Sequence, residues 1–250
     1  MIRECSGRMY QYVDEHAYLE RESLDKGNRV REELLTQDLT TEEFESLLNL
    51  RLDFVYARLP MEFWEEAAPV GVSRALLKEV DEYVKYHRRA YKRGLGLTLL
   101  GSNFSGKLSA LYYLCRGLVL QRFKCFTVTY SQLTFFLREC KDNAMLKFEL
   151  SDRLNADFFF LLGVPESDEL PIFVKQDLFA CLELRLSSER PTFFSAETRC
   201  SSLNDLLPDS LLGRILVPFT RVNKLIVAND SVDLDLLHRE RWDGMIDGTD

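Results

Sequence analysis

The sequence predicts an α/β fold: a mainly parallel sheet flanked by helices, with a helical N-terminal region. The first observation behind this prediction is that short apolar runs of strand length alternate with longer amphipathic runs from about residue 73 onward. The second is a Gly-x-x-x-x-Gly-Lys segment, Gly101 to Lys107, between the first apolar run and an apolar helix. The third is size, because 250 residues, 46% of them hydrophobic, suffice for one sizeable core and a smaller appendage.

The net charge of −8 is concentrated in the N-terminal quarter of the chain. Residues 1–66 hold 16 Asp and Glu against 8 Lys and Arg, whereas residues 67–250 hold 24 of each. An acidic region repels phosphate backbones, so we expect it to bind a protein partner, and we expect weak or no binding of nucleic acid. The six cysteines are scattered without a Cys-x-x-Cys pair, so neither a metal site nor a disulfide framework is expected.

The chain is predicted to be cytoplasmic and to bind no membrane. No apolar run reaches transmembrane length, and the N-terminus lacks the uninterrupted apolar core of a secretory signal.

Helical structure is expected before residue 60. Apolar residues recur at helical spacing between residues 8 and 35. Thr40 and Glu43 then form a capping-box pattern at the start of another helix, which ends at the next proline. We therefore divide the chain into an acidic, helical, partner-binding region at 1–59 and a P-loop domain at 60–250.

The remainder alternates strands and helices. Ser73 is placed to cap a long helix whose basic end, Lys85 to Arg93, is either a solvated helix terminus or a nucleic-acid contact. Residues 141–155 are predicted to form a polar transition anchored by Phe148 and Leu150. The other expected elements are strands at 95–100, 124–129, 157–162, 191–195 and 224–227, and helices at 107–120, 131–140, 171–186 and 203–217.

The P-loop is the predicted nucleotide site. Its two glycines permit a tight turn whose backbone N–H groups point at a polyphosphate, and Lys107 adds a positive charge for the β and γ phosphates. Its members are Gly101, Ser102, Asn103, Phe104, Ser105, Gly106, Lys107 and Leu108. Two outcomes stay open: Lys107 holds ATP or ADP without magnesium, or it pairs with a carboxylate such as Glu197 and the pocket takes no nucleotide.

Both positions that hold Mg²⁺ in a P-loop NTPase lack an oxygen ligand here. Leu108 stands where a Ser or Thr hydroxyl is needed, and the third strand ends at Leu162 and Gly163 without a carboxylate. The acidic residues from Glu166 to Glu169 would reach the phosphates only if their loop folded back, and would otherwise form a solvated loop. Neither a bound metal nor a catalytic residue is therefore expected.

From about Leu59 to Val227, the order of these segments resembles the AAA+ ATPases of the bacterial helicase-loader and insertion-sequence transposition-helper (IstB-like) family. The matching stretches are ARLPMEF at 57–63, GLTLLG at 96–101, ADFFFL at 156–161, FACLELRL at 179–186, RPTFFS at 190–195 and LGRI at 212–215. The resemblance implies a homo-oligomeric ring or spiral, and N-terminal helices that grip a partner such as a hexameric helicase.

Further site residues follow from the resemblance alone. Arg214 falls in the arginine-finger segment, where it would face the nucleotide of the neighbouring subunit; without the resemblance, it is read as a surface residue. The acidic pair of the family's Walker B motif falls on Leu162 and Gly163, and the Asn of its sensor 1 falls on Glu197, which makes a degenerate sensor. These departures predict loss of hydrolysis.

Three functions are weighed on this basis. The first, which we favour, is a catalytically inactive pseudo-ATPase that serves as a protein-binding or scaffold component of a larger assembly. The second is a functional ATP-dependent helicase loader or transposition-helper ATPase acting on DNA. The third, a small-molecule kinase, is the weakest because no residue is placed as a general base for an acceptor.

Overall fold

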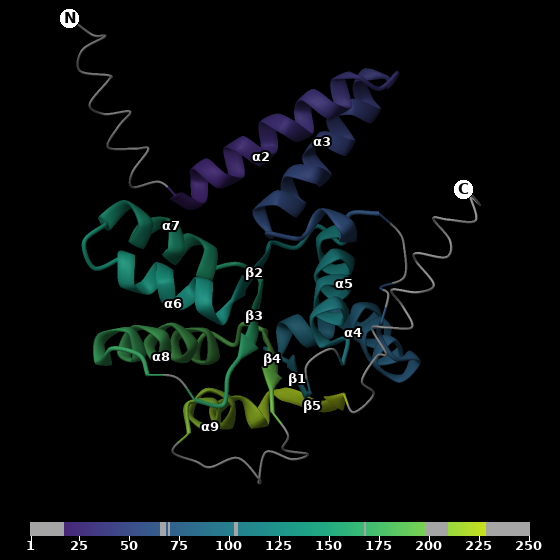
Figure 1. Cartoon of the computed structure of the whole chain (residues 1–250). Coiled ribbons are helices and arrows are strands. Elements are labelled where there is room, and N and C mark those ends of the chain that lie inside the picture. The colour runs from purple at the N-terminus through teal and green to yellow at the C-terminus, as the bar shows by residue number, and fades with distance from the viewer. Residues whose placement is uncertain are drawn as a thin grey trace, which may run out of the picture.

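The computed structural model describes residues 18–228 apart from 66–68, 70, 103–104, 168 and 199–209, with side chains from residue 25 onward. Within these ranges a five-stranded parallel sheet has helices on both faces (Figure 1). The strand order is β2-β3-β4-β1-β5, with β1 Gly96–Gly101, β2 Cys125–Thr129, β3 Phe158–Val164, β4 Thr192–Glu197 and β5 Asn223–Ala228. The predicted parallel sheet is therefore confirmed.

The helices follow the strands in the expected alternation. They are α2 Tyr18–Leu35, α3 Thr41–Tyr56, α4 Arg74–Lys92, α5 Lys107–Leu120, α6 Tyr130–Glu139, α7 Ala144–Leu154, α8 Ile172–Ser187 and α9 Leu211–Leu216, with short 3-10 turns η1 Met61–Phe63 and η3 Val217–Arg221. Both predicted caps are present: Thr40 and Glu43 form the capping box of α3, and the Ser73 hydroxyl accepts a hydrogen bond from the Leu76 N–H at 3.2 Å. None of the described helices is long and apolar enough to cross a membrane.

Alternate side chains of the strands face two cores on opposite sides of the sheet. Phe158 and Phe160 of β3 lie in the core formed with α4, α5 and the end of α3. Phe159 and Leu161 lie in the core formed with α6, α7, α8 and α9. A strand that is buried on both faces needs an apolar residue at every position, which explains the unbroken apolar run in this part of the sequence.

The N-terminal helices α2 and α3 form an arm that projects from the body (Figure 1). The arm has a small core of its own, in which Val30, Leu34 and Val55 are buried. The last turn of α3 contributes to both cores, because Val55 faces the arm whereas Phe54 and the nearby Leu59 lie in the same core as α4 and α5. The division of the chain at residue 59 stays a prediction, and contacts cross it.

The segment 141–155 differs from its predicted form. It contains the helix α7, which begins where the Asn143 side chain accepts a hydrogen bond from the Leu146 N–H at 2.9 Å. Leu146 and Leu150 lie one turn apart and are both buried. Phe148 lies on the opposite side of the helix and is 73% exposed, so the prediction that it anchors this segment was wrong.

Candidate functional site

The phosphate loop follows β1 at the edge of the sheet where the carboxyl ends of the parallel strands meet. Gly101 has a φ of +148° and Gly106 a φ of +76°. A Cβ atom at Gly101 would lie 2.2 Å from the Ala228 carbonyl oxygen, and one at Gly106 would lie 2.4 Å from the Gly71 carbonyl oxygen. Both positions therefore require glycine, as the P-loop spacing indicates.

Lys107 begins α5 and is only 6% exposed. Its ammonium group donates hydrogen bonds to the carbonyl oxygens of Gly101 at 2.9 Å and Ser102 at 2.5 Å, and to the Ser105 hydroxyl at 2.9 Å. An ammonium group has three donors, so the loop itself uses all of them. A phosphate bound in this loop would take over some of these hydrogen bonds.

Burial lowers the pKa of Lys107, and the negative charge of Glu197 opposes that shift. Glu197 ends β4, in register with Gly101 of β1, and its side chain is exposed. The degenerate sensor position thus lies on the strand beside the loop. Its carboxylate would meet a bound polyphosphate with like charge.

Leu108, the next residue of α5, is 44% exposed and carries no oxygen or nitrogen in its side chain. On the other side of the site, β3 ends in a bulge: its pairing with β4 is irregular between Leu161 and Val164, and Gly163 has a φ of +67°. The Gly163 N–H donates to the Ser195 hydroxyl at 2.9 Å. Neither position supplies a magnesium ligand, and the described residues contain no group of three or more His, Cys, Asp or Glu suited to a metal.

Glu166 is held closer to the loop than its sequence position suggests. Its carboxylate accepts a hydrogen bond from the Thr198 hydroxyl at 2.5 Å, and the Thr198 N–H donates to the Gly101 carbonyl oxygen at 3.3 Å. Thr198 therefore connects Glu166 to Gly101, the first residue of the P-loop. Among its acidic neighbours, Asp168 lies outside the described residues and Glu169 is exposed.

Arg214 lies on α9 and is exposed. Its guanidinium stacks 4.5 Å from the centroid of the Phe179 ring, which belongs to α8. Arg214 is thus positioned by a contact within its own chain, on the helical layer that contains α6 to α9. Its role as an arginine finger stays a prediction.

The structure brings together most of the predicted loop, with Asn103 and Phe104 outside the described residues. At the basic end of α4 the Lys and Arg side chains are exposed, whereas His87 is buried. The His87 Nδ1 lies 2.6 Å from the Val84 carbonyl oxygen, and its ring packs against Phe123. Sequence reasoning missed a second cluster of cations, Lys26, Arg29 and Arg58, which line a cavity between α2 and the body. The three cations come from α2 and from the segment after α3, so no local sequence pattern predicts that they meet.

No family model and no curated protein matches the sequence. Solved structures do match: the DnaC helicase loader (17% identity, 68% of this chain and 99% of that chain, TM-score 0.57) and DnaI (18% identity, 68% and 92%, TM-score 0.51). AMPPCP-bound DnaA from Aquifex aeolicus is similar at 12% identity, over 74% of this chain and 56% of that chain, with a TM-score of 0.53. At these identities the likeness shows only that the chain shares the fold of these proteins.

Proposed function

We propose that this chain is a nucleotide-binding relative of the AAA+ helicase loaders that does not hydrolyse ATP and acts as a protein-binding component of a larger assembly. The observation that carries the proposal is the contrast within the site. The phosphate loop keeps the two glycines that its backbone requires and a buried Lys107, whereas Leu108 and the bulged end of β3 offer no oxygen for magnesium. Phosphoryl transfer by P-loop enzymes depends on that metal, so binding without turnover is the outcome that these residues favour.

The arm formed by α2 and α3 supports a role in binding a protein partner. It projects from the body, and residues 1–66 carry twice as many acidic as basic side chains. Its small core joins the body through the end of α3, and α2 also contacts α7. A basic surface on a partner would complement this charge.

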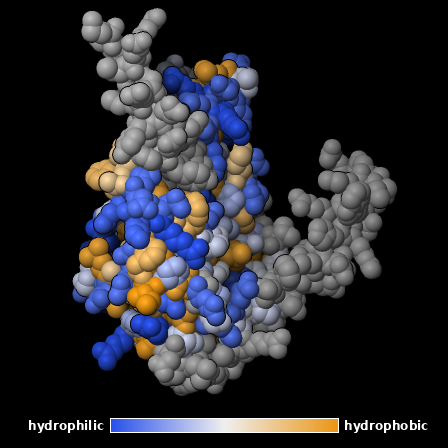
Figure 2. Space-filling view, turned by 60° about the vertical axis from the view of Figure 1, so that its left-hand side comes forward, coloured by the Kyte–Doolittle hydropathy of each residue, from blue (hydrophilic) through white to orange (hydrophobic). Residues whose placement is uncertain are grey.

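A second surface supports the same role. The face turned forward in Figure 2 shows hydrophobic residues among hydrophilic ones. On α7 and α8, Phe148 and Ile172 are 73% and 76% exposed, and Leu184 is also exposed. Large apolar side chains exposed at this level are available for contacts with a protein. We assign this face and Arg214 to contacts within a homo-oligomer, as the fold of the helicase loaders suggests.

The affinity for ATP with and without magnesium tests the proposal. We expect calorimetric titrations in EDTA and in excess Mg²⁺ to give dissociation constants that agree within about twofold, because the Leu108 side chain has no oxygen and β3 ends without a carboxylate to hold the metal. Lys107→Ala should weaken binding about tenfold or more in both buffers, since a buried charge-assisted contact is lost. Tightening by magnesium of more than about tenfold would contradict the proposal.

Glu166 favours one alternative, a functional ATPase with a displaced acidic residue. Its carboxylate is linked through Thr198 to Gly101 at the carboxyl edge of the sheet. If this carboxylate orients a water or a metal, Glu166→Gln should abolish ATP hydrolysis while leaving ATP affinity nearly unchanged. If the proposal holds, the wild-type chain and Glu166→Gln release phosphate at the same background rate.

A further inference from the structure

A cavity of about 400 Å³ lies between the arm and the body, away from the phosphate loop. Lys26 and Arg29 of α2 line it, together with Arg58 and Trp64 from the segment after α3 and Tyr112 of α5. The carboxyl end of β2 and the start of α6 close it, with Thr127, Thr129 and Gln132. None of the described residues of the segment 101–108 lines it, so we treat it as a separate site at the same edge of the sheet.

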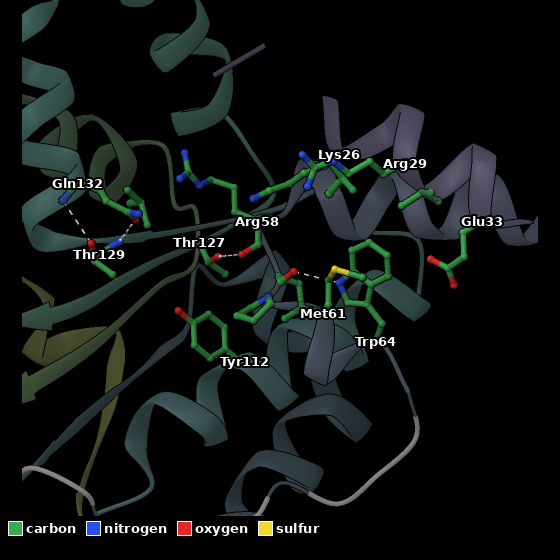
Figure 3. A pocket seen from close by; sticks show the side chains of 15 residues that line it. Lys26, Arg29, Glu33, Arg58, Met61, Trp64, Tyr112, Thr127, Thr129 and Gln132 are labelled. Atoms are coloured by element: carbon green, nitrogen blue, oxygen red, sulfur yellow. Dashed lines mark hydrogen bonds between the residues drawn. The ribbon is translucent and has the colours of Figure 1, made fainter. Parts of the chain in front are cut away.

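The two sides of the cavity differ in chemistry. Figure 3 shows Lys26, Arg29 and Arg58 along one side and Met61, Trp64 and Tyr112 along the other. One side is therefore cationic and the other is aromatic and apolar.

Three cationic side chains line the cavity although the arm as a whole is acidic. Among the residues whose side chains the structure describes, Glu33 is the one acidic residue that lines it, and its carboxylate pairs with Arg51 at 2.8 Å. Within the described part of the chain, no ion pair joins Arg29 to a carboxylate. Three of the eight basic residues in 1–66 thus meet around one cavity.

The aromatic side is held in place before any ligand binds. The Trp64 indole N–H donates to the Leu59 carbonyl oxygen at 2.9 Å, and its ring lies 5.8 Å from that of Phe54. The Thr127 hydroxyl contacts the carbonyl oxygens of Ala57 at 2.8 Å and Arg58 at 3.1 Å. These contacts fix the corner that carries both Arg58 and Trp64, so little ordering is required on binding.

We propose that this cavity binds a nucleoside phosphate, with the phosphate at Lys26, Arg29 and Arg58 and the base against Trp64 and Tyr112. Guanidinium and ammonium groups hold phosphate oxygens, and bases stack on aromatic rings. The volume lies within the range of small-molecule sites. A simple anion would leave the aromatic side unused, and an apolar ligand would leave the cations unused.

The ligand would connect the arm to the body, because Lys26 and Arg29 belong to α2 whereas Tyr112 belongs to α5 and Arg58 and Trp64 to the segment between α3 and α4. Two kinds of ligand could supply the nucleoside phosphate: a free mononucleotide, or one nucleotide of a single strand. The same titration, with a mononucleotide and with an oligonucleotide, distinguishes them.

The test uses Trp64 as the reporter in the full-length chain. The chain has two tryptophans, so Trp242→Phe leaves Trp64 alone. Titration with AMP and with dTMP should quench its fluorescence in a saturable way. Arg29→Gln should weaken the apparent affinity about fivefold or more, because one charge-assisted contact is lost. The matched control is Arg89→Gln, which removes an exposed cation on α4 and should leave the apparent affinity unchanged.

Two more titrations separate this cavity from the phosphate loop and a free nucleotide from a strand. Lys107→Ala removes the lysine of the phosphate loop and should leave the quenching of Trp64 by AMP unchanged. A failure of this inference is therefore distinguishable from a failure of the proposed function. Tighter binding of an oligo(dT) strand than of dTMP assigns the ligand to a strand, and equal or weaker binding assigns it to a free nucleotide. No quenching, quenching that Arg29→Gln leaves unchanged, or equal binding of inorganic tripolyphosphate would overturn the inference.

Discussion

Lys107 and Leu108 are neighbours in the sequence with opposite surroundings. Lys107 is buried and its ammonium group contacts three oxygens of its own loop, whereas Leu108 is 44% exposed on the outer side of the same helical turn. A hydroxyl at Leu108 would cost little in packing, so the apolar side chain is not required by the fold. At the residue scale, the loop keeps its buried lysine, whereas the side chain of Leu108 offers no oxygen to a metal.

The loop glycines give a prediction at this scale. Gly101→Ala should lower the free energy of unfolding by about 2–4 kcal/mol, because the added Cβ would overlap the Ala228 carbonyl oxygen and the backbone φ is positive. Gly163→Ala is the control: its φ is +67°, but no atom lies within 4 Å of the added Cβ. It should cost only about 1 kcal/mol, from the backbone conformation alone. Equal losses in urea unfolding would show that contact with Ala228 is not what requires glycine.

At the element scale, the sequence predicted best those elements that are apolar on every side or strongly amphipathic. The strand 157–162 and the helix after Ser73 were predicted within about two residues. The helix α7 was missed because its polar face dominates the segment 141–155, although Asn143 and the one-turn spacing of Leu146 and Leu150 were available as signals. The bulge at Gly163 depends on pairing with β4, which no local pattern encodes.

The contact between α3 and α7 gives a pH-dependent prediction. The Tyr56 hydroxyl donates to the Asp152 carboxylate at 3.2 Å, and burial raises the pKa of Tyr56 to about 12 from an ordinary value of 10.0. The unfolded chain therefore releases this proton first. The stability that the neutral phenol contributes is fully present below pH 10 and is lost between pH 10 and about 12.

Tyr56→Phe removes both the hydrogen bond and this titration. It should cost about 1 kcal/mol at a pH of about 8. Its stability should then fall less steeply than that of the wild-type chain between pH 10 and about 12, as urea unfolding would measure. Tyr86→Phe, an exposed tyrosine on α4, serves as the control. If the free energy of unfolding fell equally with pH in the wild-type chain and in Tyr56→Phe, the raised pKa of Tyr56 would not be the cause of the loss of stability.

The separate core of the arm gives a further prediction. Leu34 is fully buried against Val30 and Val55, and Leu34→Ala should cost about 2–4 kcal/mol within that cluster. Because this core is distinct from those of the sheet, hydrogen exchange should accelerate in α2 and the first turns of α3 and stay slow in β1 and β3. Faster exchange throughout the sheet would mean that the arm and the body unfold as one unit.

At the scale of the whole molecule, the sequence predicted the sheet, its order of elements and the location of the phosphate loop. It did not predict the cavity beside α2, because Lys26, Arg58 and Tyr112 come from three segments that only the folded arm brings together. The net acidity of residues 1–66 concealed this basic cluster. The molecule thus combines a phosphate loop, an acidic arm and exposed apolar side chains on α7 and α8, features that support the proposed role in a larger assembly.

Whether this molecule binds ATP without hydrolysing it is decided most directly by phosphate release from the full-length chain in ATP and Mg²⁺, beside Lys107→Ala prepared in the same way. We expect the two preparations to release phosphate at the same background rate, because no oxygen from Leu108 or from the end of β3 holds the metal. Sustained turnover in the wild-type chain that Lys107→Ala abolishes would contradict this expectation.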